Sequence, residues 1–279
     1  MKRLWLATAA ILVASCVSQP VPSPEPEKPV QRTEEYKVPI VIKETVSFAD
    51  GVVERVVEHS YDDGYARLLS TVARKPSSPD PVERVDYEYS GGELAAKSTF
   101  GADGALSSRS EYAYGSGGAL ARETIKDGVG GVQSVSEWRW SDGRKASWRV
   151  LSAAGLVLAR TDYSYKGDVP AAASMYDGAG ALQGRLEYGY ENGIVLSRIE
   201  YFDATGVRDG WIDYVHANGR LTQESAYRAD GRLERRLSYE YSPDGALIKR
   251  ILADATGKTR EIVGYDYAYR TETRIVTSE

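Results

Sequence analysis

The chain has 279 residues, of which 42% are hydrophobic and 27% are charged, a composition typical of a folded, water-soluble protein. It contains 20 tyrosines but only 3 phenylalanines, so most of its aromatic surface ends in a polar hydroxyl and suits half-exposed sheet faces. The formal charge of −5 becomes −7 when Lys2 and Arg3 are removed, and without a basic surplus we expect no nucleic-acid partner.

The first fifteen residues are predicted to be a signal peptide. Lys2 and Arg3 form a positive start, and the apolar stretch from Leu4 to Val13 is too short to span a bilayer. Cys16 follows directly and is the only cysteine of the chain, so no disulfide can form within one molecule. An ordinary secretory peptide with a chance cysteine at its cleavage site is the alternative.

The segment Val13-Ala14-Ser15-Cys16 resembles the lipobox of bacterial lipoproteins. The resemblance implies that cleavage makes Cys16 the new N-terminus and that its sulfur carries a diacylglycerol, with a further acyl chain such as palmitate on the nitrogen. Several acyl chains together anchor a protein stably, because each buried CH₂ contributes roughly 0.8 kcal/mol. Val17 follows where lipoproteins retained in the inner membrane carry aspartate, so we expect the outer membrane, with the anchor as the contact to lipid.

Residues 16–35 are expected to be the lipidated cysteine and a tether. Five prolines fall within ten residues, interleaved with serine, glutamate and lysine: Pro20, Pro22, Pro24, Pro26 and Pro29. Alternating prolines favour extended polyproline II and remove backbone hydrogen-bond donors. This segment should therefore act as a semi-rigid spacer.

Residues 36–279 are predicted to form one domain of repeated β-hairpins. An aromatic residue recurs every 25 or 26 positions, at Tyr36, Tyr61, Tyr87, Tyr112, Trp138, Tyr163, Tyr188, Tyr214, Tyr239 and Tyr265. A second series lies halfway between, at Phe48, Phe100, Ile125, Leu151, Tyr176, Tyr201, Tyr227 and Leu252, with Arg74 breaking it. Such a period indicates units that bury their faces by stacking on their neighbours.

The recurring turn sequences and the alternation of apolar and polar residues predict that the array is all-β. Asn-Gly and Asp-Gly pairs recur between strands of about eight residues and supply the positive φ that tight hairpins need. In the segment 233–241, period-two alternation places Leu233, Leu237, Tyr239 and Tyr241 on one face and Glu234, Arg236, Ser238 and Glu240 on the other. No window shows a helical period.

We therefore expect an antiparallel meander of 16–18 short strands. Adjacent strands rotate by roughly 20–25°, and open sheets rarely exceed about ten strands without curling, so the meander should coil into a superhelical sheet or half-barrel. A membrane-spanning barrel is the competing closure. Arg and Glu on most strands oppose it, because each Arg or Lys at the bilayer midplane costs about 2–4 kcal/mol.

The repeat resembles the YD repeats of RHS-type proteins and is similar to MORN-variant repeats of bacterial lipoproteins. Tyr-Asp occurs at residues 61–62, 176–177 and 265–266, and Gly-Arg-Leu occurs at 219–221 and 231–233. The likeness covers roughly residues 36–279. It implies a coiled β architecture without catalytic residues, and the chain is too short to enclose a toxin as the shells of that family do.

Few residues offer catalytic or metal chemistry. The two histidines are His59 and His216, and His216 takes the place of a ladder aromatic. Two histidines and an acylated cysteine cannot build a usual zinc site, so we expect no metal and no cofactor. Four aspartates precede turn glycines and are interpreted as turn formers, with calcium as the alternative: Asp103, Asp142, Asp230 and Asp244. We expect no enzymatic activity.

The candidate binding patch is a group of tryptophans, Trp138, Trp140, Trp148 and Trp211, with Arg139 and Arg149 expected on the opposite face. Flat aromatic side chains can stack on sugars or receive a partner's side chains. The alternative is that these rings only fill the ladder. The sequence predicts a lipid-anchored envelope scaffold or protein-interaction module with no catalysis, and alternatively a carbohydrate-binding protein that uses the Trp138–Trp148 patch, facing the periplasm or the cell surface.

Overall fold

The computed structural model describes residues 31–277, and all of its regular elements are strands. Signal peptide, Cys16 and most of the predicted tether lie outside the described residues. The strands are β1 (Gln31–Phe48), β2 (Val53–Tyr61), β3 (Leu68–Arg74), β4 (Pro81–Ser90), β5 (Glu93–Gly101), β6 (Leu106–Tyr114), β7 (Leu120–Asp127), β8 (Val132–Ser141), β9 (Arg144–Ser152), β10 (Val157–Lys166), β11 (Val169–Asp177), β12 (Leu182–Glu191), β13 (Val195–Asp203), β14 (Arg208–Ala217), β15 (Arg220–Arg228), β16 (Leu233–Tyr241), β17 (Leu247–Asp254) and β18 (Thr259–Thr277).

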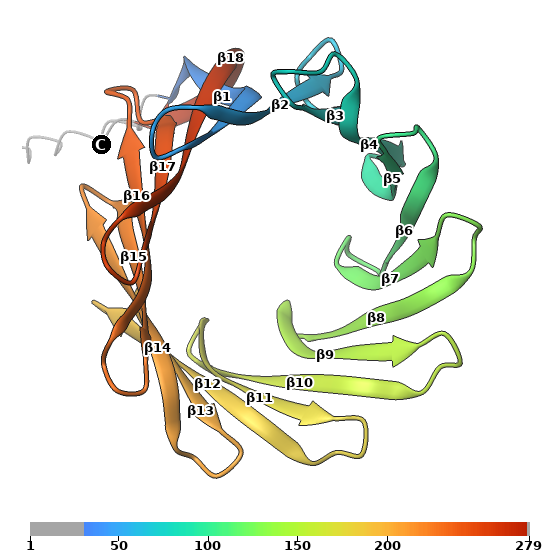
Figure 1. The fold of residues 1–279 in the computed structure, drawn as a ribbon. Helices are drawn as coiled ribbons and strands as arrows, with labels where there is room; N and C mark the ends of the chain where they lie inside the picture. The colour runs from blue at the N-terminus through green and yellow to red at the C-terminus, as the bar shows by residue number, and fades with distance from the viewer. Residues whose placement is uncertain (1–30, 278–279) are drawn as a thin grey trace, which may run out of the picture. The chain divides into compact units, whose positions relative to one another are not determined.

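The eighteen strands form one antiparallel sheet, and the sheet is closed. Each strand pairs with the next in the chain, and β1 pairs with both β2 and β18. The ion pair of Lys43 Nζ with Asp266 Oδ2, at 3.4 Å, joins β1 to β18 at the closing seam. Figure 1 shows the hairpins following one another in chain order. The meander and its strand number are confirmed, whereas the expected open superhelix or half-barrel is wrong.

A β-bulge in every strand pair explains the closure. Each of the seventeen consecutive pairs contains one register shift, close to a turn. Bulges bend a strand and increase its local twist, so regularly repeated bulges add curvature in a constant sense. The one-residue insertions do not alter the 25-residue period, and for this reason the period alone did not predict a closed sheet.

The tight turns follow their residue chemistry. Asp142, Asn192 and Asn218 adopt φ near +51°, and the glycine after each is also at positive φ. Two successive positive φ values characterise the hairpin turn that matches the twist of the flanking strands. At the other end of the hairpins, an aspartate that begins the turn accepts two backbone N–H groups, as Asp177 Oδ1 does from Ala179 at 3.0 Å and from Ala181 at 2.9 Å.

A ladder of aromatic side chains spans the hairpins. In seven of the nine even-numbered strands a Tyr or Trp donates its polar hydrogen to a backbone carbonyl of the preceding strand: Tyr61, Tyr89, Tyr114, Trp140, Tyr165, Tyr241 and Tyr267. In Tyr114, for example, the hydroxyl lies 2.9 Å from the carbonyl oxygen of Leu94. The face that carries these rings is called the tyrosine face below.

The start of the repeat differs from the predicted register. Tyr61 donates to the carbonyl of Val41 and follows a bulge at Ser60, so it occupies the second ladder position rather than the first. His59 therefore stands at the first position in β2. Tyr36 belongs to the odd-numbered strand β1 and is not a member of the ladder. The irregular loop between β2 and β3 replaces a tight turn, and counting residues across it misassigned both tyrosines.

The opposite side of the sheet is an ion-pair face. Arg109 bonds Glu88 at 2.6 Å, Arg149 bonds Glu137 at 2.7 Å and Arg198 bonds Asp213 at 2.6 Å. Arg149 pairs across the strands with Glu137 and Arg139 with Ser147, which confirms that Arg139 and Arg149 lie opposite the tryptophans. The buried hydrophobic side chains are small and scattered along the sheet: Val46, Ala73, Ala96, Val135, Ala173, Ala226, Ala246 and Val263. Cross-strand stacking thus replaces a central core.

The outer parts of β1 and β18 form a small unit of their own, distinct from the main unit Lys37–Thr271. Within it Tyr36 donates a hydrogen bond of 2.7 Å to Glu272 Oε2. Arg274 lies 3.2 Å from Glu34 and places its guanidinium 5.6 Å from the Tyr36 ring centre. β1 begins at Gln31, five residues before the domain boundary expected at Tyr36.

Candidate functional site

Three of the four candidate tryptophans lie together on the tyrosine face. Trp138 of β8 and Trp148 of β9 are direct cross-strand partners, and Trp140 follows two residues after Trp138 on the same side of β8. Trp140 is 42% exposed, and its indole N–H donates to the carbonyl of Leu120 at 2.8 Å. The indole nitrogen of Trp148 is buried without a hydrogen-bond partner among residues 31–277.

Lys145, the cross-strand partner of Trp140, lines a shallow hollow of about 420 Å³. Lys145 lies 6.0 Å from the Trp140 ring centre and 5.6 Å from that of Tyr163, both within the range of cation–π attraction. Tyr163 and Tyr165 line the hollow, and Arg144 contributes its charge at the rim. The hollow therefore combines flat rings with cationic groups.

Trp211 does not belong to this group, and its place in the predicted patch is wrong. It pairs with Glu200 of β13 and with Tyr227 of β15, which puts it on the ion-pair face. Its ring stacks on Tyr227 with centres 5.0 Å apart, and the Arg208 guanidinium lies 4.5 Å from its ring centre. Trp211 lies three residues before Tyr214 in the same strand. Because side chains alternate between the two faces, an odd spacing puts the two rings on opposite faces, and the sequence alone already shows this.

The histidines take ladder positions. His216 pairs with Leu221 after a bulge, as Tyr241 pairs with Leu247 in a later repeat, which confirms its role as a ladder substitute. Its Nδ1 is buried without a hydrogen bond among the described residues 31–277. His59 Nε2 lies 3.1 Å from Glu44 Oε1 at the seam. The hydrogen bond with His59 holds the pKa of Glu44 below its usual range.

Turn aspartates serve the backbone. Asp103 and Asp230 each accept the N–H two residues on, at 3.0 Å, and Asp142 takes the positive φ of its turn. Asp244 accepts hydrogen bonds from Ser242 and Tyr269. The turn-former interpretation is thereby confirmed for these residues. No group of three or more potential metal ligands exists within residues 31–277.

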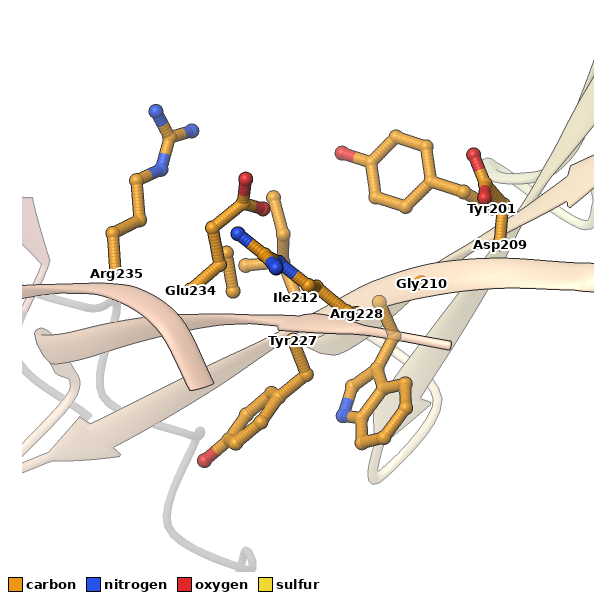
Figure 2. A pocket seen from close by; sticks show the side chains of 10 residues that line it. Tyr201, Asp209, Gly210, Ile212, Tyr227, Arg228, Glu234 and Arg235 are labelled. Atoms are coloured by element: carbon orange, nitrogen blue, oxygen red, sulfur yellow. The ribbon is translucent and has the colours of Figure 1, made fainter. Parts of the chain in front are cut away.

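A second hollow, which the sequence did not single out, lies on the tyrosine face around Gly210. It measures about 380 Å³ and is called the Gly210 hollow. Its floor is Gly210 and Ile212 of β14 with Ala226 of β15, and Tyr201 of β13 forms one wall. Figure 2 shows the polar rim, in which Asp209, Arg228, Glu234 and Arg235 rise on the same side as Tyr201, while Tyr227 points the opposite way.

Two bulges supply the carboxylates of this rim. Tyr201 pairs with Gly210 and Phe202 with Arg208, so Asp209 is the extra residue of a bulge. Ala226 pairs with Arg235 and Tyr227 with Leu233, so Glu234 is the extra residue of the next one. Bulges re-aim side chains, and here both acids turn towards the hollow. The prediction that Leu233 shares a face with Leu237, and Glu234 with Arg236, is corrected for the same reason.

The rim departs from the rest of the repeat in a way that the sequence records. In some other repeats the bulge residue bonds the aspartate that begins the turn, as Gln133 does to Asp127 and Gln183 to Asp177. At the hollow, Asp209 follows the turn of Asp203 and the two carry like charges. In the next repeat Arg228 begins the turn and Glu234 is the bulge residue. None of Asp209, Arg228, Glu234 and Arg235 takes part in an ion pair within the described part of the chain.

Phenol groups beside the hollow are shifted by their surroundings. Burial raises the pKa of Tyr201, and the nearby Glu224 raises it further while Arg235 opposes the effect. Burial together with Glu224 raises the pKa of Tyr214 to about 12. Tyr239 Oη donates to Glu224 Oε1 at 2.5 Å, and burial and this carboxylate raise the pKa of Tyr239 strongly. These hydroxyls remain neutral donors at ordinary pH.

Residues 31–277 include no helix that could cross a membrane. No protein-family model matches the sequence, and a search of curated proteins finds no match. The anchor prediction at Cys16 concerns residues outside the described range and stays a prediction.

Solved structures with a related arrangement of strands include two porin-like proteins and a toxin. The chain is similar to a porin-like protein from Bacteroides uniformis ATCC 8492, with 12% identity, 82% of this chain and 98% of that chain covered, and a TM-score of 0.45. A porin-like protein from Bacteroides vulgatus ATCC 8482 has 10% identity, the same coverage and a TM-score of 0.36. The Photorhabdus luminescens Tc holotoxin pore has 12% identity and a TM-score of 0.22, and the match covers 81% of this chain and 15% of that chain. Likenesses this distant carry no argument about function.

Proposed function

We propose that this protein is a non-catalytic interaction module of the bacterial cell envelope, anchored through lipid on Cys16. The observation that carries the proposal is the tyrosine face itself. It presents a Tyr or Trp from strand after strand, and such rings supply large contact area at low conformational cost. Their hydroxyl and indole hydrogens are largely committed to the sheet, so the rings are held rigidly for a partner.

Closure of the sheet determines how a partner would bind. All eighteen strands have neighbours on both sides, so no free edge remains for an added strand. A partner must therefore contact side chains on one of the two faces. Exposed Trp140 with its neighbours Lys145 and Tyr163 is the most aromatic such surface, and Trp and Tyr are the side chains that most often dominate interface energies.

Charge on both faces argues for an anchored protein rather than a membrane-spanning barrel. The ion-pair face carries Arg109, Arg149 and Arg198 within its strands. The tyrosine face carries Arg235 and Arg250, which pair across the strands with Ala226 and Tyr239. Whichever face met lipid, arginines near the midplane would each cost about 2–4 kcal/mol.

Two experiments test the module and its anchor. Metabolic labelling with a palmitate analogue should mark the wild-type protein and not Cys16→Ala. Equal labelling of both proteins would contradict a lipid anchor at Cys16. Crosslinking pull-down from envelope extracts should recover a partner with wild type and lose it with Trp140→Ala. Trp211→Ala, on the opposite face, is the matched control. Recovery of the same partner by all three proteins would contradict binding at the Trp140 surface.

Carbohydrate binding is a second candidate, favoured by the hollow beside Trp140. Aromatic rings stack on the apolar side of sugars, and the cationic Arg144 and Lys145 at its edge can bond hydroxyl or acid groups. A glycan array should then give signals with wild type that fall with Trp138→Ala and with Tyr165→Ala. Signals that survive both substitutions, in proteins that keep their thermal transition, would exclude this patch as the sugar site.

A further inference from the structure

We infer that the Gly210 hollow binds a small zwitterion, an amino acid or short peptide with free amino and carboxyl ends. Its volume of about 380 Å³ lies within the range of about 300–1,000 Å³ typical of small-ligand sites. The site is separate from the Trp140 surface, since its wall and floor come from β13, β14 and β15. The inference therefore does not depend on the function proposed above.

The rim offers charges of both signs that the protein does not use. Arg228 and Arg235 stand on adjacent strands, and within residues 31–277 neither makes an ion pair, although most arginines of the opposite face do. A guanidinium binds a carboxylate through two parallel hydrogen bonds. Two such groups at the edge of one hollow provide a place for the ligand's carboxylate.

Asp209 and Glu234 provide the opposite pole. Both are bulge residues that point to the hollow, and the structure gives neither an ion pair nor a hydrogen bond among the described residues. A carboxylate accepts hydrogen bonds from an ammonium group and attracts its charge. With two acids and two arginines the rim is neutral overall, so it complements a ligand that carries one charge of each sign rather than a simple anion or cation.

The floor and wall fit the remainder of such a ligand. Gly210 lies buried in the floor, where a Cβ would meet the carbonyl oxygen of Tyr227 at 2.5 Å, and Ala226 and Ile212 offer methyl groups beside it. The Tyr201 ring covers one side, and its neutral hydroxyl is available as a further donor. A short aliphatic side chain or peptide unit would lie against these groups. An extended peptide that adds a strand is excluded, because the closed sheet has no free edge.

Matched dipeptides test the inference by calorimetric titration of the full-length protein in detergent. Alanyl-alanine carries both charges, N-acetyl-alanyl-alanine only the carboxylate, and alanyl-alanine amide only the ammonium. We expect saturable binding of the zwitterion and binding weaker by about tenfold or more for each modified form, because each loses a charge-assisted contact. Equal binding of all three, or no saturable binding of alanyl-alanine, would overturn the inference.

Variants assign the charges. Arg235→Gln should weaken alanyl-alanine by about tenfold but leave the already weak amide unchanged, since the amide has no carboxylate to lose. Glu234→Gln should also weaken the binding of alanyl-alanine by about tenfold. It should leave the already weak N-acetyl form unchanged, since that form has no ammonium group to lose. Arg232→Gln changes an arginine on the nearby turn that pairs with Asp230, and it should bind like wild type. An equal loss of affinity for every ligand in every variant would contradict this assignment of charges. Binding of a galacturonic acid dimer that is stronger than binding of alanyl-alanine would overturn the inference and reassign the hollow to acidic sugars.

Discussion

Tyr239 of β16 and Glu224 of β15 are joined by a hydrogen bond of 2.5 Å on the tyrosine face. The carboxylate raises the pKa of Tyr239, and the same carboxylate contributes to the raised pKa values of Tyr214 and Tyr201. Burial is the largest cause of all three raised pKa values, and Glu224 adds to it. The protein should consequently be sensitive to alkaline rather than neutral conditions in this region.

The first prediction concerns alkaline unfolding. Because the folded-state pKa of Tyr214, about 12, exceeds the unfolded value near 10, its contribution to stability is complete below about pH 10 and disappears as the pH rises towards 12. Tyr214→Phe should flatten the fall of the melting temperature over this interval. Phenolate absorbance, followed together with the melting temperature, measures the effect. An unchanged slope in the variant would contradict the pKa of Tyr214.

The second prediction concerns acid. Hydrogen bonds from the Thr256 hydroxyl, with backbone groups and Arg260, lower the pKa of Asp254 to about 2. A depressed pKa contributes stability above the unfolded value near 4 that is lost as the pH falls towards 2. Asp254→Asn should therefore show a shallower decline of melting temperature between about pH 4 and pH 2. An equally steep decline in the variant and in wild type would contradict the lowered pKa of Asp254.

The third prediction tests the ladder. Tyr114→Phe removes the hydrogen bond to the Leu94 carbonyl and should lower the free energy of unfolding by about 0.5–1.5 kcal/mol. Tyr190 stands at the same ladder position, but its hydroxyl has no hydrogen bond within the described residues, so Tyr190→Phe should change little. Denaturant unfolding compares the two. Equal losses would show that the hydroxyl bonds do not stabilise the sheet.

The fourth prediction restores the ladder. His216 replaces a tyrosine and leaves a buried nitrogen without a partner among residues 31–277. His216→Tyr should place a hydroxyl near the carbonyl of Leu196, by analogy with Tyr241 and the Leu221 carbonyl, and should raise stability by about 1 kcal/mol. Thermal unfolding measures it. A lower melting temperature would mean that the site at His216 is too narrow for the ring.

The fifth prediction compares two glycines in strands. A Cβ on Gly210 would lie 2.5 Å from the carbonyl oxygen of Tyr227, so Gly210→Ala must displace backbone and should cost about 1–3 kcal/mol. A Cβ on Gly189 would meet its nearest atom, Arg198 Cβ, at 3.5 Å, an ordinary contact. Gly189→Ala should be neutral or stabilising by about 0.4–1 kcal/mol. Similar losses in both would contradict the close approach at Gly210.

The sequence predicted the features that depend on the repeat period and on turn chemistry. It did not predict the features that single bulge residues determine, namely the closure of the sheet and the face on which some side chains lie. The 25-residue repeat and the Asn-Gly turns gave the meander, and cross-strand pairing confirms Trp138 with Trp148. Bulges leave no mark in the period, so closure and the side on which Glu234 lies were both missed. Trp211 was grouped with the other tryptophans although its odd spacing from Tyr214 puts it on the opposite face.

The Gly210 hollow was overlooked for a related reason. Its charges are ordinary surface residues when each is considered alone, and only their position in the bulges brings them to one side. The available signal was comparative: Gln133 and Gln183 bond their turn aspartates, whereas Asp209 cannot bond Asp203. The like charges of Asp203 and Asp209 mark this repeat as one that lacks the bond seen at Asp127 and Asp177.

The pairing of β1 with β18 closes the sheet, so that β1 lies between β2 and β18. Strand pairing is therefore continuous around the sheet, and opening the chain at one of the turns while linking β1 to β18 should preserve that pairing. Gain or loss of sequence should be tolerated best in units of one complete hairpin, because a lone additional strand would have to run parallel to one neighbour, a slightly less stable pairing, where the circuit closes.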